Sequence, residues 1–436
     1  MAFFQENIRV IDKRWPAVGE TLTAALTTGA LEWVSHGAER TVLVSGIQLT
    51  SAYDRRAEAS VQAELIPVTS RTATVYGFAL GDLPRVLLQR PALVSLRVII
   101  MNPELAAIGC RAADQTDWLS DPRVDVAFAW EEERICTPFA AAPTALRLAA
   151  NRAAKLRDAV VLALARPFQE RYFRAMDAEL DARLVENMSF VEKDGDVASL
   201  FDSAEGKRVA VVAGGPTAAE RFETLRAERN DCVVIAVSTA LRSILSSGIV
   251  PDIVVVIDPK PEMTAHFEGI DEAMLRQVPL VYLPTVHPDV LHRWPGRRLA
   301  TYIARPRFER AAKTLPKGML FCAGSVTHAA VDLAVRMGAK EVELIGADFS
   351  FPDRLRHVEG AAEDGRIDAH EGAAHPFVLN GLGGRNPSRT DMVGFLRDLE
   401  VYIADHPSVV FRNTGRAGAV IAGAEWLDEG EACSTT

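Results

Sequence analysis

The chain has 436 residues, of which 48% are hydrophobic and 24% are charged, and its formal net charge is -10. This length predicts two or three domains, and the composition excludes a disordered chain. The acidic balance argues against nucleic acid as a partner, because binding a phosphate backbone requires a concentrated basic surface.

The first 137 residues are expected to form a small α/β domain. Short β-branched runs at Thr41–Ser45, Thr74–Phe78 and Leu96–Met101 predict buried strands. The glycine-rich run Gly77–Gly81 lies between strand and helix signals. It is either a nucleotide-binding turn like those of methyltransferases or a tight glycine turn with no ligand role. We favour the second because glycine-rich turns between strand and helix are common in α/β folds.

Residues 138–206 are expected to be a helical connector. Alanine, arginine and leucine recur there at helical spacing, and Pro138, Pro143 and Pro167 are expected to start or break helices. The polar turn Glu205–Lys207 ends the connector, which predicts a domain boundary between Val191 and Lys207.

Residues 207–425 alternate apolar strands with helices, which predicts a Rossmann-like domain with a mainly parallel sheet. Right-handed crossovers bring the carboxyl ends of such strands to one edge, where ligands bind. The expected fold is therefore α/β: this central domain, preceded by the smaller α/β domain and the connector, followed by a C-terminal helical region and a tail at 426–436. The expected strands are Arg208–Ala213, Cys232–Val237, Ile253–Ile257, Leu280–Leu283 and Glu341–Ile345.

Glycine and hydroxyl residues follow several of these strands. The run Gly214-Gly215-Pro216-Thr217 comes between the first strand and a helix, so its backbone N–H groups and the helix dipole predict a phosphate cradle. Gly324 and Ser325 begin another helix and offer further donors. Ser238 follows the second strand and either caps a helix or faces a ribose or base.

Two aspartates end buried strands and are candidate catalytic residues. Asp258 follows the third strand and Asp348 follows the last, where a carboxylate can hold a ribose hydroxyl, a metal ion or a reacting proton. Asp252, by contrast, is expected to cap the strand entry. No DxD-type metal motif lies at these strand ends, so a metal is optional, and Mg²⁺ is compatible with the two carboxylates.

His357 is the preferred general base because it follows the strand that ends at Asp348 and exchanges protons near neutral pH. His370 and His375 lie in the same region, and the sequence does not choose among the three. The loop Asp353–Asn386 is long enough to serve as a lid over substrate.

The five cysteines are far apart and show no C-x-x-C spacing for a metal. No stretch contains the roughly 18 apolar residues that a membrane span requires, and the first residues have no apolar leader core. A cytoplasmic, reducing environment is therefore expected.

The order of these motifs resembles the Maf (motility accessory factor) glycosyltransferases, which share their central domain with the 6-hydroxymethylpterin diphosphokinase MptE-like proteins. The resemblance covers most of the chain and reaches back weakly to Gly77–Gly81. It is carried by Gly214–Thr217, Ile249–Asp258, Gly324–Val326, Gly346–Phe349, His357–Gly360, Arg412–Gly415 and Gly418–Gly423.

The resemblance implies transfer of a nonulosonic acid, of the pseudaminic or legionaminic type, from a CMP-activated donor to serine or threonine of flagellin. The central fold is similar to that of bacterial sialyltransferases, whose Gly-Asn-Gly-Pro-Ser loop holds CMP. Here Gly214 stands in place of that asparagine, and Ser238 replaces a second one. The segment 384–391 occupies the position at which those enzymes carry their catalytic histidine, and it contains no histidine.

Two other functions remain open from the residues. The first is diphosphate transfer to a pterin, with Asp258 and Asp348 holding Mg²⁺ under ATP, and the second is a non-catalytic module that binds nucleotide or flagellin. For glycosyl transfer, the expected catalytic residues are His357, Asp348 and Asp258. The expected nucleotide-binding residues are Gly214, Gly215, Pro216, Thr217, Ser238, Gly324, Ser325, Thr390 and Asn413.

Overall fold

A computed structural model describes residues 2–26, 29–361, 365–368 and 376–427. The chain divides into two compact units, Met1–Ala165 and Arg166–Thr436, which are described separately. They meet inside one long helix, α8 (Ala154–Lys193), whereas the sequence pattern places its domain limits near residues 137 and 207. Those limits stay a prediction.

The N-terminal unit contains a four-stranded parallel sheet and a separate three-stranded antiparallel sheet. The three strands expected from the sequence are present, as β2, β4 and β5. The elements that precede α8 are α1 (Ala2–Arg14), α2 (Pro16–Ala24), β1 (Glu32–His36), β2 (Glu39–Val44), β3 (Ile47–Gln48), α3 (Arg55–Ala63), β4 (Thr72–Tyr76), α4 (Asp82–Leu88), β5 (Ser95–Ile100), α5 (Pro103–Ala112), α6 (Thr116–Leu119), β6 (Val124–Phe128), β7 (Phe139–Ala141) and α7 (Pro143–Arg147).

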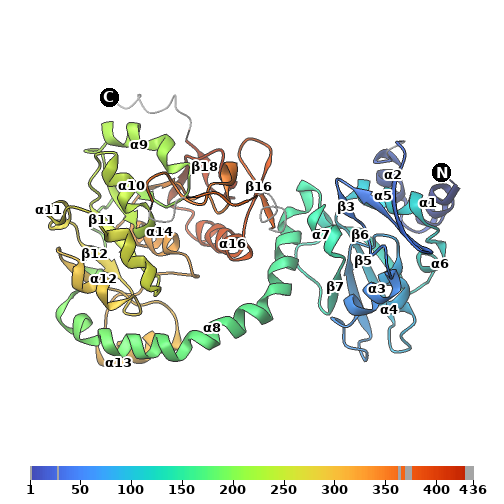
Figure 1. The fold of residues 1–436 in the computed structure, drawn as a ribbon, viewed down its shortest axis with the longest axis horizontal. Coiled ribbons are helices and arrows are strands. Elements are labelled where there is room, and N and C mark those ends of the chain that lie inside the picture. The colour runs from blue at the N-terminus through green and yellow to red at the C-terminus, as the bar shows by residue number, and fades with distance from the viewer. Residues whose placement is uncertain (1, 27–28, 362–364, 369–375, 428–436) are drawn as a thin grey trace. The chain divides into compact units, whose positions relative to one another are not determined.

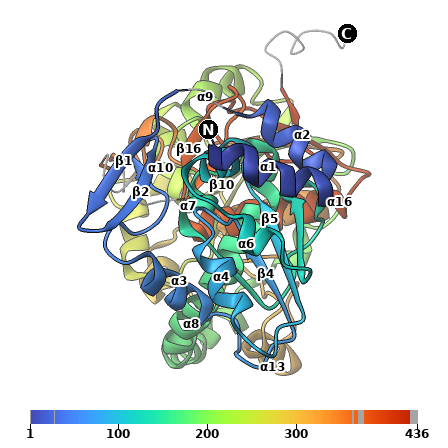
Figure 2. The ribbon, with the colours of Figure 1, turned by 90° about the vertical axis from the view of Figure 1, so that its right-hand side faces the viewer.

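The four-stranded sheet has the order β6-β5-β4-β7 and is buried on both faces. In β5, Leu96 and Val98 contribute to one hydrophobic cluster and Ile99 contributes to the other, as the two-residue period of a strand requires. Figure 2 views this unit with β4 and β5 near its centre. Covering on both faces is the usual state of a parallel sheet, because its crossover helices pack on either side.

The second unit is built on a nine-stranded sheet in which every pair is parallel (Figure 1). The expected α/β fold, with a large parallel sheet and a smaller N-terminal one, is thereby confirmed. The strands are β8 (Gly195–Asp196), β9 (Arg208–Val212), β10 (Cys232–Val237), β11 (Ile253–Val256), β12 (Leu280–Tyr282), β13 (Arg298–Ala300), β14 (Glu341–Ile345), β17 (Val410–Asn413) and β18 (Glu425–Trp426).

The strand order, β18-β17-β14-β9-β10-β11-β12-β13-β8, places a topological switch at β9. From β9 the chain moves outward through β10, β11, β12 and β13, and then returns to the opposite side of β9 as β14. Ligands of open α/β sheets bind at such a switch, outside the carboxyl ends of the strands. A two-stranded hairpin of β15 (Phe377–Leu379) and β16 (Arg385–Pro387) follows β14 in the chain.

Helices connect the strands of the large sheet. The last turn of α14 ends at Gly338, whose φ of +85° makes it the expected C-terminal glycine. Pro167 was expected to start or break a helix, but it lies inside α8. The helices after α8 are α9 (Ala218–Ala227), α10 (Leu241–Ser246), α11 (Glu272–Leu275), α12 (Pro288–Arg293), α13 (Pro306–Thr314), α14 (Val326–Arg336) and α16 (Thr390–Ala404).

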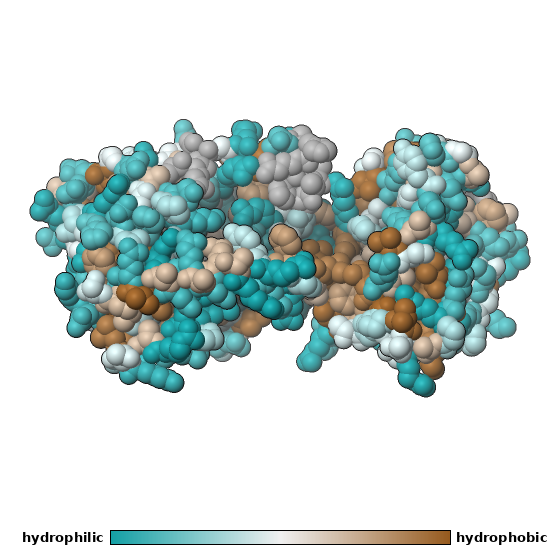
Figure 3. Space-filling view, turned by 60° about the horizontal axis from the view of Figure 1, so that its bottom comes forward, coloured by the Kyte–Doolittle hydropathy of each residue, from teal (hydrophilic) through white to brown (hydrophobic). Residues whose placement is uncertain are grey.

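The surface drawn in Figure 3 is mostly hydrophilic on each unit, with hydrophobic residues in patches between the polar ones. Within the described residues, no helix has both the length and the apolar character that a membrane span demands.

Candidate active site

The loop after β9 lies against the segments that follow β14 and β10, and its two glycines are required by these close approaches. Gly215 donates its N–H to the carbonyl of Gly346 at 2.9 Å. A Cβ on Gly215 would lie 2.4 Å from that carbonyl oxygen, and a Cβ on Gly214 would lie 2.5 Å from Oγ1 of Thr239. Both glycines therefore have a packing role, whether or not they also face a phosphate.

Asp348 lies at the N-terminus of α9, next to the proposed phosphate cradle. Its side chain is buried, Oδ2 accepts the Thr217 N–H at 3.0 Å, and Oδ1 accepts the Thr217 hydroxyl at 2.5 Å. The carboxylate thus satisfies a helix N-terminal donor that a phosphate would otherwise take. Pro216 has no backbone N–H. Among the described N–H groups of Gly214, Gly215 and Thr217, only that of Gly214 donates to no protein acceptor.

Burial raises the pKa of Asp348 to about 6, and the two hydrogen bonds from Thr217 oppose that rise by favouring the charged form. Asp348 therefore changes charge in mildly acidic solution rather than near pH 4. A carboxyl group that titrates in this range can exchange protons during a reaction or set the charge of the loop.

A third loop, after β17, closes on the same carboxylate. A Cβ on Gly418 would lie 2.3 Å from Oδ1 of Asp348, and Ala419 donates its N–H to the Asp348 carbonyl at 2.9 Å. Asn413 is buried, and its Nδ2 donates to the carbonyl of Ala419 at 3.1 Å. Asn413 thus holds the loop in place beside Asp348. Gly415 approaches as closely, since its Cβ would lie 2.0 Å from Oγ1 of Thr217.

His357 contacts the loop after β9 from the segment that follows β14. Its Nδ1 lies 3.2 Å from the carbonyl oxygen of Gly214, and the N–H of Val358 donates to the same oxygen at 3.0 Å. Because a carbonyl only accepts, Nδ1 carries the proton and Nε2 is the basic nitrogen of the neutral ring. The alternative bases His370 and His375 lie outside the described residues.

Asp258 and Asp348 do not form a pair. They follow β11 and β14, which are separated by β10 and β9, so about 14 Å of sheet lies between the two strands. Asp258 is half-buried and accepts the Lys260 N–H at 3.0 Å. Ser238 is buried at the end of β10, between them in the sheet. Asp252 accepts the Val234 N–H at 2.7 Å, which confirms its expected capping of the strand entry.

The segment before α14 contributes Gly324 and Ser325. Ser325 caps the helix, with its Oγ accepting the Thr327 N–H at 3.3 Å. Gly324 has a φ of +111°, and its Cβ would lie 2.8 Å from the ring of Phe395 in α16. Thr390, another of the expected nucleotide-binding residues, is the first residue of α16.

His328 is fully buried within α14 and joins it to α16. Its Nδ1 accepts the Ala323 N–H at 3.3 Å, and its Nε2–H donates to the carbonyl of Phe395 at 2.8 Å. Burial lowers the pKa of His328 to about 4, so the ring is neutral at physiological pH. His328 therefore fixes the packing of the two helices.

Sequence reasoning missed a buried network behind Asp348. The Ser350 hydroxyl donates to the Asp348 carbonyl at 2.9 Å, and Asn386 Nδ2 donates to Ser350 Oγ at 3.1 Å. Asn386 belongs to β16, so the hairpin supports the strand end that carries Asp348. No sequence pattern links residues this far apart. Within the ranges that the structure describes, no three His, Cys, Asp or Glu side chains are grouped as metal ligands.

Comparisons with known proteins identify part of this unit. Residues 182–354 match the family described as 6-hydroxymethylpterin diphosphokinase MptE-like, so the chain carries an MptE-like domain and that part of the expected resemblance is confirmed. A curated relative, the 6-hydroxymethyl-7,8-dihydropterin pyrophosphokinase of Pyrococcus furiosus, is 27% identical over 192 residues, which are 42% of this chain and 77% of that protein.

Two solved structures are similar to this chain over different lengths. The Maf glycosyltransferase from Magnetospirillum magneticum AMB-1 matches 98% of this chain and 74% of its own, with 17% identity and a TM-score of 0.43. A spermidine synthase from Thermotoga maritima matches 26% of this chain and 46% of its own, with 13% identity and a TM-score of 0.19.

Proposed function

We propose that this chain is a transferase that moves a nonulosonic acid from a CMP-activated donor to serine or threonine of flagellin. The observation that carries the proposal is the contact between His357 and Gly214, because it brings a proton acceptor to the nucleotide loop at the switch point. The donor and acceptor classes are those implied by the resemblance of the motif order to the Maf glycosyltransferases.

In this proposal the reaction breaks the bond between the sugar anomeric carbon and the CMP phosphate oxygen. The acceptor hydroxyl oxygen forms the new bond to that carbon, and its proton passes to Nε2 of His357. CMP leaves with the bonding electron pair, and in this proposal the Gly214 N–H donates to the developing phosphate charge. Asp258 accepts hydrogen bonds from the ribose hydroxyls. The nucleotide is bordered by Ser238, Gly324, Ser325 and Thr390.

The second candidate is diphosphate transfer to a pterin, which the named activity of the Pyrococcus furiosus relative favours. The spacing of the two aspartates opposes its simplest form. Mg²⁺ requires oxygen ligands at about 2.0–2.1 Å, and carboxylates on strands about 14 Å apart do not share one ion. Diphosphate transfer would therefore need other ligands for its metal.

Calorimetry with CMP, CDP and ATP separates the two candidates. Selective binding of CMP supports glycosyl transfer, whereas ATP binding that depends on Mg²⁺ supports the kinase. A decisive test follows with CMP-pseudaminic and CMP-legionaminic acid as donors and purified unmodified flagellin as acceptor. An unchanged intact mass of flagellin with both donors would reject the transferase assignment.

The role of His357 is tested with His357→Ala and a matched control, His406→Ala. His406 is also half-buried, but it bonds the Tyr402 carbonyl near the end of α16. We expect kcat to fall about 10²–10⁴-fold in His357→Ala, with little change in CMP affinity, because a general base contributes about that much. The control should retain wild-type kcat, and an equal loss in both variants would assign His357 a structural role only.

A further inference from the structure

The loop after β9 leaves few hydrogen-bond donors for a phosphate. Pro216 has no N–H, and the Gly215 N–H donates to a carbonyl of the segment after β14 at 2.9 Å. The N–H and the hydroxyl of Thr217 both donate to Asp348. Within the described loop, the backbone donor that remains is the Gly214 N–H. The phosphate of a CMP-activated donor has two free oxygens and a negative charge, so it requires further donors from a neighbouring element.

Thr239, in the segment after β10, lies against the same glycine. A Cβ on Gly214 would lie 2.5 Å from Oγ1 and 2.9 Å from Cβ of Thr239, and then 3.4 Å from Nδ1 of His357. The threonine side chain therefore occupies the space into which a side chain at position 214 would extend. Thr239 is half-buried, and in the part of the chain that the structure describes its hydroxyl forms no hydrogen bond with a protein group.

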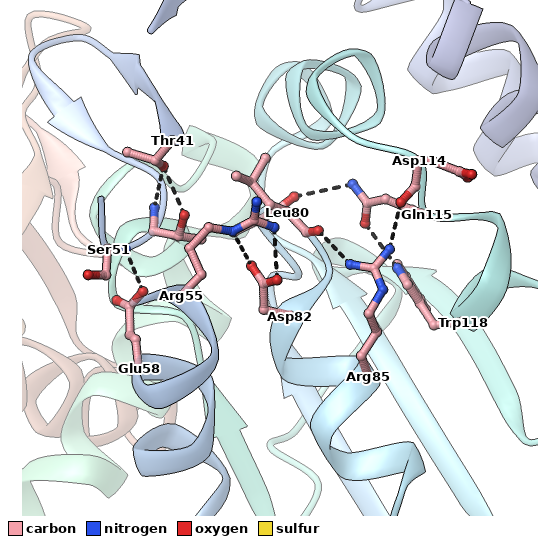
Figure 4. Close-up of polar contacts among 12 residues, drawn as sticks. Thr41, Ser51, Arg55, Glu58, Leu80, Asp82, Arg85, Asp114, Gln115 and Trp118 are labelled. Carbon is pink, nitrogen blue, oxygen red and sulfur yellow. Dashed lines mark hydrogen bonds and ion pairs between the residues drawn. The ribbon is translucent and has the colours of Figure 1, made fainter. Parts of the chain in front are cut away.

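The N-terminal unit has a comparable glycine turn, after β4, whose polar neighbours are already paired. A Cβ on Gly81 would lie within 2.9 Å of three polar side chains, those of Trp118, Gln115 and Arg85. Trp118 Nε1 donates to Gln115 Oε1 at 3.0 Å, as Figure 4 shows. Arg85 Nη1 donates to the Leu80 carbonyl at 3.0 Å (Figure 4). The side chains at that turn therefore hold it together, whereas the hydroxyl beside Gly214 still has a proton to donate.

Contacts around Thr239 fix the segments that meet at Gly214. Ser243, in the helix that follows Thr239, donates its hydroxyl to the Glu359 carbonyl at 2.7 Å. The adjacent Val358 N–H donates to the Gly214 carbonyl at 3.0 Å. The segment that carries the proposed base is thus joined both to the loop after β9 and to the helix after β10. A hydroxyl held between fixed segments is oriented before a ligand binds, which is the condition for effective electrostatic stabilisation.

We propose that Thr239 is a nucleotide-binding residue whose hydroxyl donates a hydrogen bond to a phosphate oxygen of the donor, beside the Gly214 N–H. This inference rests on the proposed function, because it takes the phosphate of a CMP-activated donor as the ligand of the loop. The hydroxyl and the N–H then hold one phosphate from two different segments. Both hydrogen bonds strengthen as CMP leaves, because the negative charge on the phosphate increases.

Thr239→Val tests the contact, because it removes the hydroxyl and keeps the branched shape of the side chain. In calorimetric titration of the full chain, CMP should bind about 10–100-fold more weakly, the loss expected for a hydrogen bond to a charged group. Cytidine has no phosphate, so its affinity should stay within about twofold. Thr224→Val is the matched control, since Thr224 is also half-buried but lies within α9, and it should bind both ligands like the wild type.

A pair of substitutions tests the position of the hydroxyl. Gly214 does not have a positive φ, so its backbone accepts a side chain once the space is free. Gly214→Ser alone meets the Thr239 side chain, and Thr239→Gly alone removes the hydroxyl. Each single variant should bind CMP about tenfold more weakly or worse. The double variant brings a hydroxyl to the same space from the other segment, so it should recover affinity to within about threefold of the wild type.

The outcomes separate this inference from the proposed function. Equal losses of CMP and cytidine affinity in Thr239→Val, or unchanged CMP affinity, overturn the phosphate contact alone. A double variant that binds CMP no better than Thr239→Gly also overturns it. Wild-type protein that binds no CMP overturns both the contact and the transferase proposal. CMP binding that depends on Thr239, with the mass of flagellin unchanged, rejects the transferase proposal and supports the contact.

Discussion

At the edge of the central sheet, close approach of neighbouring loops explains which residues are glycine. A lone glycine pair after a strand is compatible with a phosphate cradle or with a tight turn, and the sequence does not distinguish them. Gly214 and Gly215 border Thr239 and Asp348, residues that lie far away in the sequence. The motif predicted the position of the loop. It did not predict that the Asp348 carboxylate accepts hydrogen bonds from Thr217 there, because the two residues meet only after folding.

Gly215→Ala tests this packing. The added Cβ meets a backbone carbonyl and a buried carboxylate, neither of which moves easily, so we expect the free energy of unfolding to fall by about 1–3 kcal/mol. Chemical denaturation measures the change. Gly29→Ala is the matched control, since no atom lies within 4 Å of its Cβ, and its effect should stay within about 0.5 kcal/mol. Equal effects would show that the contact at Gly215 relaxes freely.

Asp348→Asn tests the buried carboxyl through pH. Its pKa is raised from 3.8 to about 6, so the folded state binds a proton more readily than the unfolded state. Its contribution to stability is therefore fully present below pH 4 and lost as pH rises through 6, a change of roughly 3 kcal/mol. The difference in unfolding free energy between wild type and Asp348→Asn should decline over that range. A difference that is constant with pH would contradict the raised pKa.

Whole strands were easier to predict when their residues form a continuous buried apolar run. The expected strands that became β9, β10, β11, β12 and β14 are all present, because long buried β-branched runs favour a central strand of a parallel sheet. The sequence did not predict β8, β13, β17 or β18, in which polar or charged residues interrupt the apolar pattern. Their place depends on pairing with neighbours, and so the edges of the sheet were missed.

The helix pair α14 and α16 supplies a prediction at this scale. His328 has a pKa lowered from 6.5 to about 4, so the unfolded state binds the proton more readily. Its stabilising contribution is present above pH 6.5 and is lost as pH falls to 4, by roughly 3 kcal/mol. The stability difference between wild type and His328→Gln, from denaturation at several pH values, should shrink on acidification. Growth of that difference at low pH would disprove a neutral buried ring.

At the scale of the whole chain, two units with separate cores should unfold in two steps. Leu96 and Leu344 are both fully buried, in β5 of the first unit and β14 of the second. We expect Leu96→Ala and Leu344→Ala each to destabilise one unit by roughly 2–5 kcal/mol and to lower one calorimetric transition only. If both transitions move together in either variant, the units unfold as one.

The burial of Asp348 and of His328 has a joint consequence for acid tolerance. As the solution is acidified from pH 6.5 to 4, the folded unit gains stability at the aspartate and loses a similar amount at the histidine. The two changes offset each other, so together Asp348 and His328 leave the free energy of unfolding of the central unit nearly constant in mild acid, although they lie on different elements. Either single substitution removes this balance, in opposite directions, and the double variant should restore it.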